Sequence, residues 1–176
     1  IDTAIVDPIL KVDGNYILIA EKGRNKICLY IDNKLQYDVD DPDTVMSAEL
    51  SSNGDVVVVT DKSSYRGGIS VYNKSGEQIF SWASGSDAVI CADISAASRS
   101  VAVALLNSDV TAKTTVQLFN VNETESYAKI EMPDTVVYEL QFVGDKVNAF
   151  GDNRVTGISS SGKIVYDNDF SNVQLT

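Results

Sequence analysis

The sequence predicts an all-β fold made of four similar repeats, and three observations support this prediction. Valine outnumbers leucine by 22 to 10, with 8 tyrosines and only 3 prolines, which is the residue usage of half-buried strands. Short apolar segments alternate with polar turns along the whole chain. The chain of 176 residues also resembles itself at a period of about 44 residues, the signature of a repeat architecture.

An aspartate marks the start of each repeat. Asp2, Asp43, Asp87 and Asp134 are 41, 44 and 47 residues apart, and each precedes an apolar segment that ends in a polar turn. Second apolar segments follow these turns at 16–20, 56–60, 100–106 and 147–150. Two further segments joined by a tight turn complete each repeat. They lie at 27–30 and 35–37 in the first repeat, at 69–72 and 78–82 in the second, at 116–119 and 127–130 in the third, and at 155–158 and 164–166 in the fourth. Each repeat therefore predicts four antiparallel strands.

Repeats of this kind are typical of the blades of a β-propeller, because one four-stranded sheet cannot bury its two apolar faces alone. We expect a single domain with blades over residues 2–42, 43–86, 87–133 and 134–171. The first strand of each blade should line the central channel, and the fourth should lie at the rim with Tyr37, Ile79 and Ile130 pointing inward. Residues 172–176 should begin a further strand or close the ring. The sequence leaves open whether four blades form a closed small propeller or half of a larger ring.

Charge and composition exclude several classes of function. The net charge is -11, so binding to nucleic acid or to an anionic membrane is disfavoured. The chain has no histidine, which removes Ser-His-Asp and Cys-His catalysis and imidazole metal sites. It has no apolar run long enough to be inserted in a membrane. Cys28 and Cys91 lie in different repeats and are interpreted as buried thiols.

The four repeated aspartates are the sharpest candidate site. In a propeller, Asp2, Asp43, Asp87 and Asp134 would gather at one mouth of the channel, where a ring of carboxylates could hold a hard cation such as Ca²⁺. The preferred interpretation is structural, because an aspartate before a strand accepts hydrogen bonds from nearby amides and a repeat copies that turn. No cofactor is therefore expected, and Ca²⁺ remains the alternative.

A second acidic group and one loop complete the candidates. The densest acidic run of the chain consists of Asp38, Asp40, Asp41 and Asp43. It lacks the ligand spacing of an EF-hand and is interpreted as a solvated loop. Tyr65 and Arg66 are expected to bind a partner because they lie in a long loop of the second repeat. Tyr65 and Trp82 could stack on a sugar or anchor a partner, although the preferred interpretation of Trp82, on an outer strand, is packing against the adjacent blade. The glycines after Arg66 precede a strand and not a helix, which argues against a phosphate-binding loop.

Residues 71–82, Val-Tyr-Asn-Lys-Ser-Gly-Glu-Gln-Ile-Phe-Ser-Trp, carry a hydrophobic pair, a turn with glycine and then an aromatic residue. With this pattern the chain resembles bacterial β-propellers with quinoprotein-like or WD40-like blades, including extracytoplasmic propellers of Gram-positive bacteria. The Gly-His and Trp-Asp dipeptides of WD40 repeats are absent, since Trp82 is followed by Ala83. The resemblance implies the fold and not a function. It is in keeping with an extracytoplasmic location, as is the start at Ile1 without methionine, which suggests a processed protein or an excised segment.

The expected function is that of a non-enzymatic binding module that presents loops to a protein or glycan partner. Two alternatives remain open. One is a carbohydrate-active enzyme that uses carboxylates, for which Glu49, Asp93 and Glu139 in predicted first strands are the available acids. The other is a structural repeat domain stabilised by an ion. If the ring is incomplete, open blade faces should also allow self-association.

Overall fold

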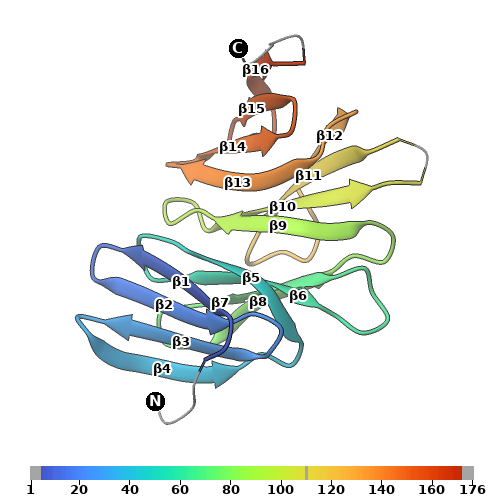
Figure 1. Cartoon of the computed structure of the whole chain (residues 1–176). Coiled ribbons are helices and arrows are strands. Elements are labelled where there is room, and N and C mark those ends of the chain that lie inside the picture. Colours follow the sequence, from blue (N-terminus) through green and yellow to red (C-terminus); the bar gives the residue numbers. More distant parts are fainter. Residues whose placement is uncertain (1–4, 110, 172–176) are drawn as a thin grey trace, which may run out of the picture. The chain divides into compact units, whose positions relative to one another are not determined.

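The computed structural model describes residues 5–109 and 111–171, and this part of the chain folds into sixteen β-strands without a helix (Figure 1). The strands form four antiparallel sheets of four strands, and the strands of each sheet are ordered as in the chain. This arrangement confirms the predicted β-propeller fold, and the sheets are called blades 1 to 4. Within the described residues, no helix offers the length and apolar character needed to span a membrane.

The strand bounds agree with the predicted repeats. Blade 1 contains β1 (Pro8–Asp13), β2 (Tyr16–Glu21), β3 (Lys26–Ile31) and β4 (Lys34–Asp40). Blade 2 contains β5 (Thr44–Leu50), β6 (Val56–Asp61), β7 (Gly68–Tyr72) and β8 (Gln78–Ala83). Blade 3 contains β9 (Ala88–Ile94), β10 (Ser100–Asn107), β11 (Lys113–Asn120) and β12 (Ala128–Pro133). Blade 4 contains β13 (Val137–Val143), β14 (Lys146–Gly151), β15 (Arg154–Ile158) and β16 (Ile164–Asp169).

The chain divides into two compact units. Unit 1 comprises residues 1–85 with blades 1 and 2, and unit 2 comprises residues 86–176 with blades 3 and 4. The division falls between the second and third repeats. The strand expected at 172–176 and the aspartate at position 2 lie outside the described residues.

The core of unit 1 lies between its two blades. We define the two faces of each blade by the strand register: the front face bears Leu18 in blade 1, Val57 in blade 2, Ala102 in blade 3 and Asn148 in blade 4, and the opposite side is the back face. Side chains alternate between the faces along each strand. The core is formed by residues of the front face of blade 1 and the back face of blade 2, namely Leu18, Ala20, Ile27, Leu29, Tyr37, Val45, Ala48, Val56, Val58 and Tyr72. Tyr37 lies beneath the β7–β8 turn, where a Cβ on Gly76 would come within 2.8 Å of its ring.

Unit 2 repeats this packing with blades 3 and 4. Its core consists of the front face of blade 3 and the back face of blade 4, namely Ala102, Ala104, Val116, Leu118, Ile130, Met132, Val137, Leu140, Val147, Ala149 and Ile158. Burial is continuous over long parts of three strands: β6 is buried from Val56 to Thr60, β7 along its whole length, and β10 from Ser100 to Leu105. Such runs are almost entirely apolar, as expected for strands whose residues are buried on both sides of the sheet.

A β-bulge recurs in the outer hairpins of blades 1, 2 and 4. The register of the third and fourth strands shifts at Leu29/Tyr30, at Val71/Tyr72 and at Gly157/Ile158. In blade 2 this shift places Phe80 opposite Val71, and Phe80 is buried whereas Ile79 is only half-buried. The expectation that Ile79 points inward is therefore wrong, because strict alternation ignores the extra residue that a bulge inserts. Tyr37 and Ile130 are buried, as expected.

Candidate functional site

The loop between β6 and β7 is a stiff extension of a hairpin. The backbone N–H of Arg66 donates to the carbonyl oxygen of Ser84 (2.8 Å), and the N–H of Ser84 donates to that of Gly67 (3.0 Å). These two bonds continue the ladder between β7 and β8 beyond the sheet. At the tip, the N–H of Tyr65 donates to the carbonyl oxygen of Lys62 at 3.0 Å. The backbone is therefore ordered up to the tip of the loop, which lowers the entropic cost of binding a partner.

The side chains at the tip face solvent. Tyr65 is 50% exposed, and Arg66 is exposed beside it. At the base of the loop, Lys62 Nζ lies 3.1 Å from Asp43 Oδ2, and both side chains are largely shielded from solvent. This ion pair connects the loop to the start of β5. Tyrosine and arginine are the residue types that contribute most to protein interfaces, so this tip is a suitable contact site.

Trp82 belongs to the sheet and not to the loop. It lies on β8 opposite Ile69, and its side chain is half-buried. The strands are close together here, because a Cβ on Gly68 would come within 2.9 Å of the Trp82 carbonyl oxygen. The structure therefore brings Tyr65 and Arg66 together at the tip, with Trp82 lower in the same hairpin.

The repeated aspartates have different partners. Asp43 makes the ion pair with Lys62, and Asp87 Oδ1 accepts a hydrogen bond from Asn107 Nδ2 at 2.8 Å. Thr44 and Ala88, which follow these aspartates directly, are the first residues of β5 and β9. In both blades the carboxylate thus connects the beginning of the first strand to the end of the second strand or the loop that follows it.

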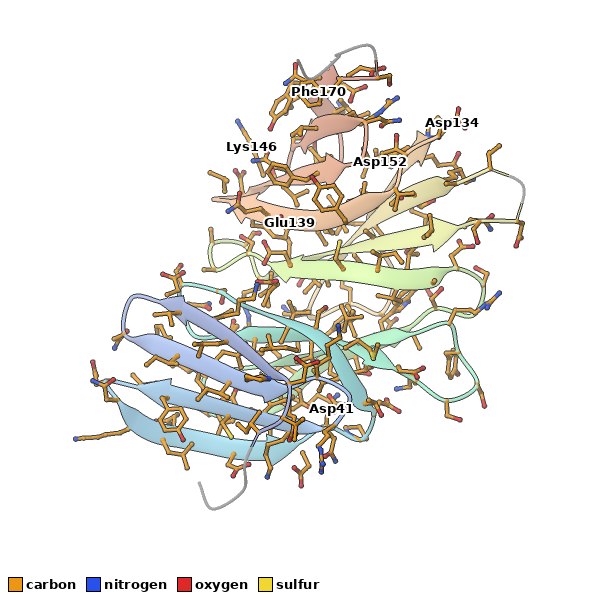
Figure 2. All side chains as sticks on the ribbon, in the orientation of Figure 1. Asp41, Asp134, Glu139, Lys146, Asp152 and Phe170 are labelled. Atoms are coloured by element: carbon orange, nitrogen blue, oxygen red, sulfur yellow. The ribbon has the colours of Figure 1, made fainter. Side chains whose placement is uncertain are left out.

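Asp134 differs from the other described members of the repeat. Its φ is +53°, and its carbonyl oxygen accepts a hydrogen bond from Asn153 Nδ2 at 2.6 Å. A neighbouring carboxylate takes the amide-binding role, since Asp152 Oδ1 accepts from the N–H of Val136 at 3.0 Å. Figure 2 shows Asp134 and Asp152 at the same end of blade 4. The sequence signal for Asp152 was its place after β14, beside a turn-forming asparagine.

Asp41 is a buried structural residue that sequence reasoning placed in a solvated loop. It is 1% exposed, directly after β4 (Figure 2). Its Oδ2 accepts from the Tyr72 hydroxyl at 2.7 Å, and its Oδ1 accepts from the N–H of Asp43 at 2.8 Å. The solvated interpretation is therefore wrong for Asp41. The Asp-Pro-Asp sequence could have revealed its turn, because aspartate commonly accepts from the amide two residues later.

The rest of the acidic run is paired with cations. Lys26 Nζ lies 2.6 Å from Asp38 Oδ1 and 3.1 Å from Asp40 Oδ1. The hydrogen bonds that Lys26 donates to these two exposed carboxylates raise the pKa of Lys26, which keeps it charged. Over residues 5–109 and 111–171, no three Cys, Asp or Glu side chains are grouped so that they could hold a metal ion. The acidic run is thus a set of local pairs, and calcium binding by Asp2 and its repeats stays a prediction.

The three acids of the predicted first strands bind other groups or face solvent. Glu49 Oε1 lies 2.7 Å from Lys11 Nζ, a contact between β5 and β1. Asp93 Oδ2 accepts from the N–H of Phe142 at 2.6 Å and thereby links β9 to β13. Glu139 is exposed on β13 (Figure 2). Glu49 and Asp93 therefore connect first strands of neighbouring blades.

Neither cysteine forms a disulfide. Cys28 is buried in β3, and Cys91 is half-buried in β9. Burial, with a smaller contribution from nearby Asp38, raises the pKa of the Cys28 thiol. A raised pKa lowers the fraction of reactive thiolate, so Cys28 is a packing residue of blade 1.

Two buried tyrosines predict a loss of stability at high pH. Burial raises the pKa of Tyr37 and of Tyr72, and the hydrogen bond to Asp41 raises the pKa of Tyr72 further. Above about pH 10 the unfolded chain loses these protons while the folded chain keeps them, so the free energy of unfolding should fall by up to about 1.4 kcal/mol per pH unit for each tyrosine.

Urea unfolding at pH 8 to 11 measures this effect, and Tyr72→Phe should make the decline shallower. Equal stability of the wild-type protein at pH 9 and pH 11 would contradict the prediction.

The comparisons with known proteins agree with this architecture. The profile of the family described as "Family of unknown function (DUF5711)" matches residues 2–173. No curated protein sequence matches the chain. Among solved structures, Sqt1 from Saccharomyces cerevisiae superposes with a TM-score of 0.65 at 11% identity, covering 92% of this chain and 48% of that one.

Two other propellers are similar. BamB from Moraxella catarrhalis has a TM-score of 0.55 at 13% identity. This match covers 90% of the present chain and 48% of the BamB chain. BBS1N, solved in complex with ARL6DN, has a TM-score of 0.56 at 14% identity. This match covers 89% of the present chain and 50% of the BBS1N chain. The chain thus spans about half the length of these structures. At such low identity the likeness shows the fold alone.

Proposed function

The chain belongs to the family of unknown function (DUF5711), and we propose that this member is a propeller module that binds a protein partner through the β6–β7 loop. The observation that carries the proposal is the exposed pair Tyr65 and Arg66 at the tip of an ordered hairpin. Aromatic and guanidinium groups on a pre-ordered backbone form contacts that lose little entropy on binding.

The propeller neighbours support a binding or scaffold role at a coarse level. BBS1N was solved together with a protein partner, ARL6DN. A protein partner suits the β6–β7 tip better than a glycan, because a sugar site needs aromatic rings that line a concave surface, and Tyr65 projects from a loop.

Charge defines the partner's surface further. The chain carries 25 acidic against 14 basic residues, so it attracts proteins with a basic surface. Arg66 would then provide a local contact to a carboxylate or carbonyl of the partner inside this acidic field. Raising the salt concentration should slow association, because long-range attraction is screened beyond about 10 Å at 0.1 M salt.

Site-specific photocrosslinking at the loop tests this proposal. A photoreactive phenylalanine analogue replaces Tyr65, and crosslinked proteins from the cells that encode the chain are identified by mass spectrometry. We expect one protein to be captured, and an added Arg66→Ala substitution should weaken its binding by about tenfold or more, as for an interface hot spot.

A matched control uses Lys74, which is exposed in the β7–β8 turn of the same blade. The analogue at Lys74 should not capture this protein, and Lys74→Ala should leave its binding unchanged. Equal capture from both positions, or binding that survives Tyr65→Ala with Arg66→Ala in a folded variant, would contradict the proposed site.

A further inference from the structure

The back face of every blade carries one continuous apolar row across its first three strands. Directly paired residues share a face, so the row can be followed through the strand register. The rows are Val12–Ile17–Tyr30, Leu50–Val56–Tyr72, Ile94–Val101–Phe119 and Phe142–Val147–Ile158. All twelve positions are apolar or aromatic, which marks this row as a packing surface between blades.

Among the described residues, those of blade 1 alone leave this surface open. In blades 2, 3 and 4, the residues contributed by the second and third strands are all buried. In blade 1, Val12 is 63% exposed, and Ile17 and Tyr30 are only half-buried. Leu10, which is paired with Ile19 on the same face, is 60% exposed. Blade 1 thus exposes a contiguous apolar face of the kind that marks an interaction site.

The front face of blade 4 is the corresponding open surface at the other end of the repeat. Tyr37 of blade 1, Phe80 of blade 2 and Tyr166 of blade 4 occupy the same position, opposite the third strand at its bulge. Tyr37 and Phe80 are buried, whereas Tyr166 is 40% exposed. Tyr166 lies across Gly157 and donates a hydrogen bond from its hydroxyl to Asn148 Oδ1 at 2.8 Å.

Polar groups beneath Tyr166 adapt this face to partial exposure. At the positions where blade 1 has Leu18 and Leu29, blade 4 has Asn148 and Gly157. The ring of Tyr166 fills the space that the missing side chain leaves above Gly157. Blade 4 therefore offers an aromatic ring, with half-buried Phe150 and Val155 in the next row, on an otherwise polar face.

We propose that the back face of blade 1 binds the front face of blade 4 from a second copy of this chain. Inside each unit, a front face packs on the back face of the following blade, and this contact would continue the same packing between two molecules. Tyr166 of one copy would cover Tyr30 of the other, as Tyr37 packs with Tyr72 of blade 2 in the core of unit 1. Sqt1 and BamB are each about twice as long as this chain, which is the length that two copies together would have.

The contact joins two different faces, so it is heterologous. Such a contact repeats from copy to copy until the assembly closes. We therefore expect a mass of twice 19.0 kDa, or a higher multiple, in light scattering after size exclusion. Val12→Asp should weaken the association by about tenfold or more, because an unpaired charge would be buried in an apolar contact.

Met46→Asp is the matched control. Met46 is an exposed apolar residue at the β-bulge of β5, and its substitution should leave the mass unchanged. Because Val12 is exposed within the single chain, the variant keeps its fold, and an unchanged circular dichroism spectrum verifies this. The loop residues Tyr65 and Arg66 are intact in both variants, so failure here is distinguishable from failure of the proposed protein-binding site.

Crosslinking identifies which faces meet. In a background with Cys28→Ala and Cys91→Ala, one sample carries Tyr30→Cys and the other carries Tyr166→Cys. Oxidation of the mixture should join one chain of each kind, and each variant alone should stay uncrosslinked. A wild-type monomer at 200 µM, on the order of 100-fold above a micromolar dissociation constant, would overturn the proposal. Crosslinks that form only between two chains of the same variant would also overturn the proposal, since they require each face to bind the same face of the other copy.

Discussion

Replacing Leu29 with alanine is expected to lower the free energy of unfolding of unit 1 by about 2–5 kcal/mol. Leu29 is fully buried in β3, opposite Leu18 and Tyr37, within the core between blades 1 and 2. Truncation removes three carbon atoms from a site with rigid sheets on both sides, so the cavity cannot collapse fully.

Hydrogen exchange read out by mass spectrometry localises this loss. Peptides from blades 1 and 2 should lose protection in Leu29→Ala. Met46→Ala, at an exposed position of β5, is the control and should change stability by at most about 0.5 kcal/mol. If both variants lost equal stability, burial of the blade interface would not be what stabilises the unit.

The second large effect is expected at Asp41. Asp41→Ala removes a buried carboxylate that accepts from the Tyr72 hydroxyl and from the Asp43 N–H. Both donors would be left without this acceptor, next to the core of unit 1. We expect a loss of about 1.5–3 kcal/mol in the free energy of unfolding, the range for hydrogen bonds to a charged group.

A pair of tyrosine variants separates the hydrogen bond from the packing. Tyr72→Phe keeps the ring but leaves Asp41 with one donor fewer, so it should destabilise the chain. Tyr37→Phe removes a buried hydroxyl for which the described residues provide no hydrogen-bond partner, so it should be neutral or stabilising.

A double-mutant cycle of Asp41→Ala and Tyr72→Phe should give a coupling energy of about 1 kcal/mol or more. Additive effects of the two substitutions would show that the hydroxyl–carboxylate bond does not contribute to stability.

The repeat made the strands of this protein predictable. Each blade places its turns and apolar segments at nearly the same intervals, so one observation locates four strands at a time. Bulges were not predictable, because an inserted residue such as Ile79 looks like its neighbours in sequence. For the same reason Phe80, and not Ile79, became the inward residue of β8.

The candidate site was predictable in part. Tyr65 and Arg66 could be chosen because a long loop between apolar strands has to be at the surface, and the structure exposes both. The turn at Asp41 could be recognised, but its burial could not, since that depends on Tyr72, which is 31 residues away in the chain. A contact of that range is created only when two blades pack together.

The sequence by itself determined the all-β fold class, the four repeats and the apolar row on each blade, because these features follow from local periodicity. The tertiary structure decided which rows are covered. Val56 and Ile17 occupy equivalent positions and are similar in chemistry, yet Val56 is buried and Ile17 is half-exposed. The difference lies in the neighbouring blade: blade 1 covers Val56, whereas no blade precedes blade 1 among the described residues. Burial is a property of the assembled sheets, and a pattern along one strand does not contain it.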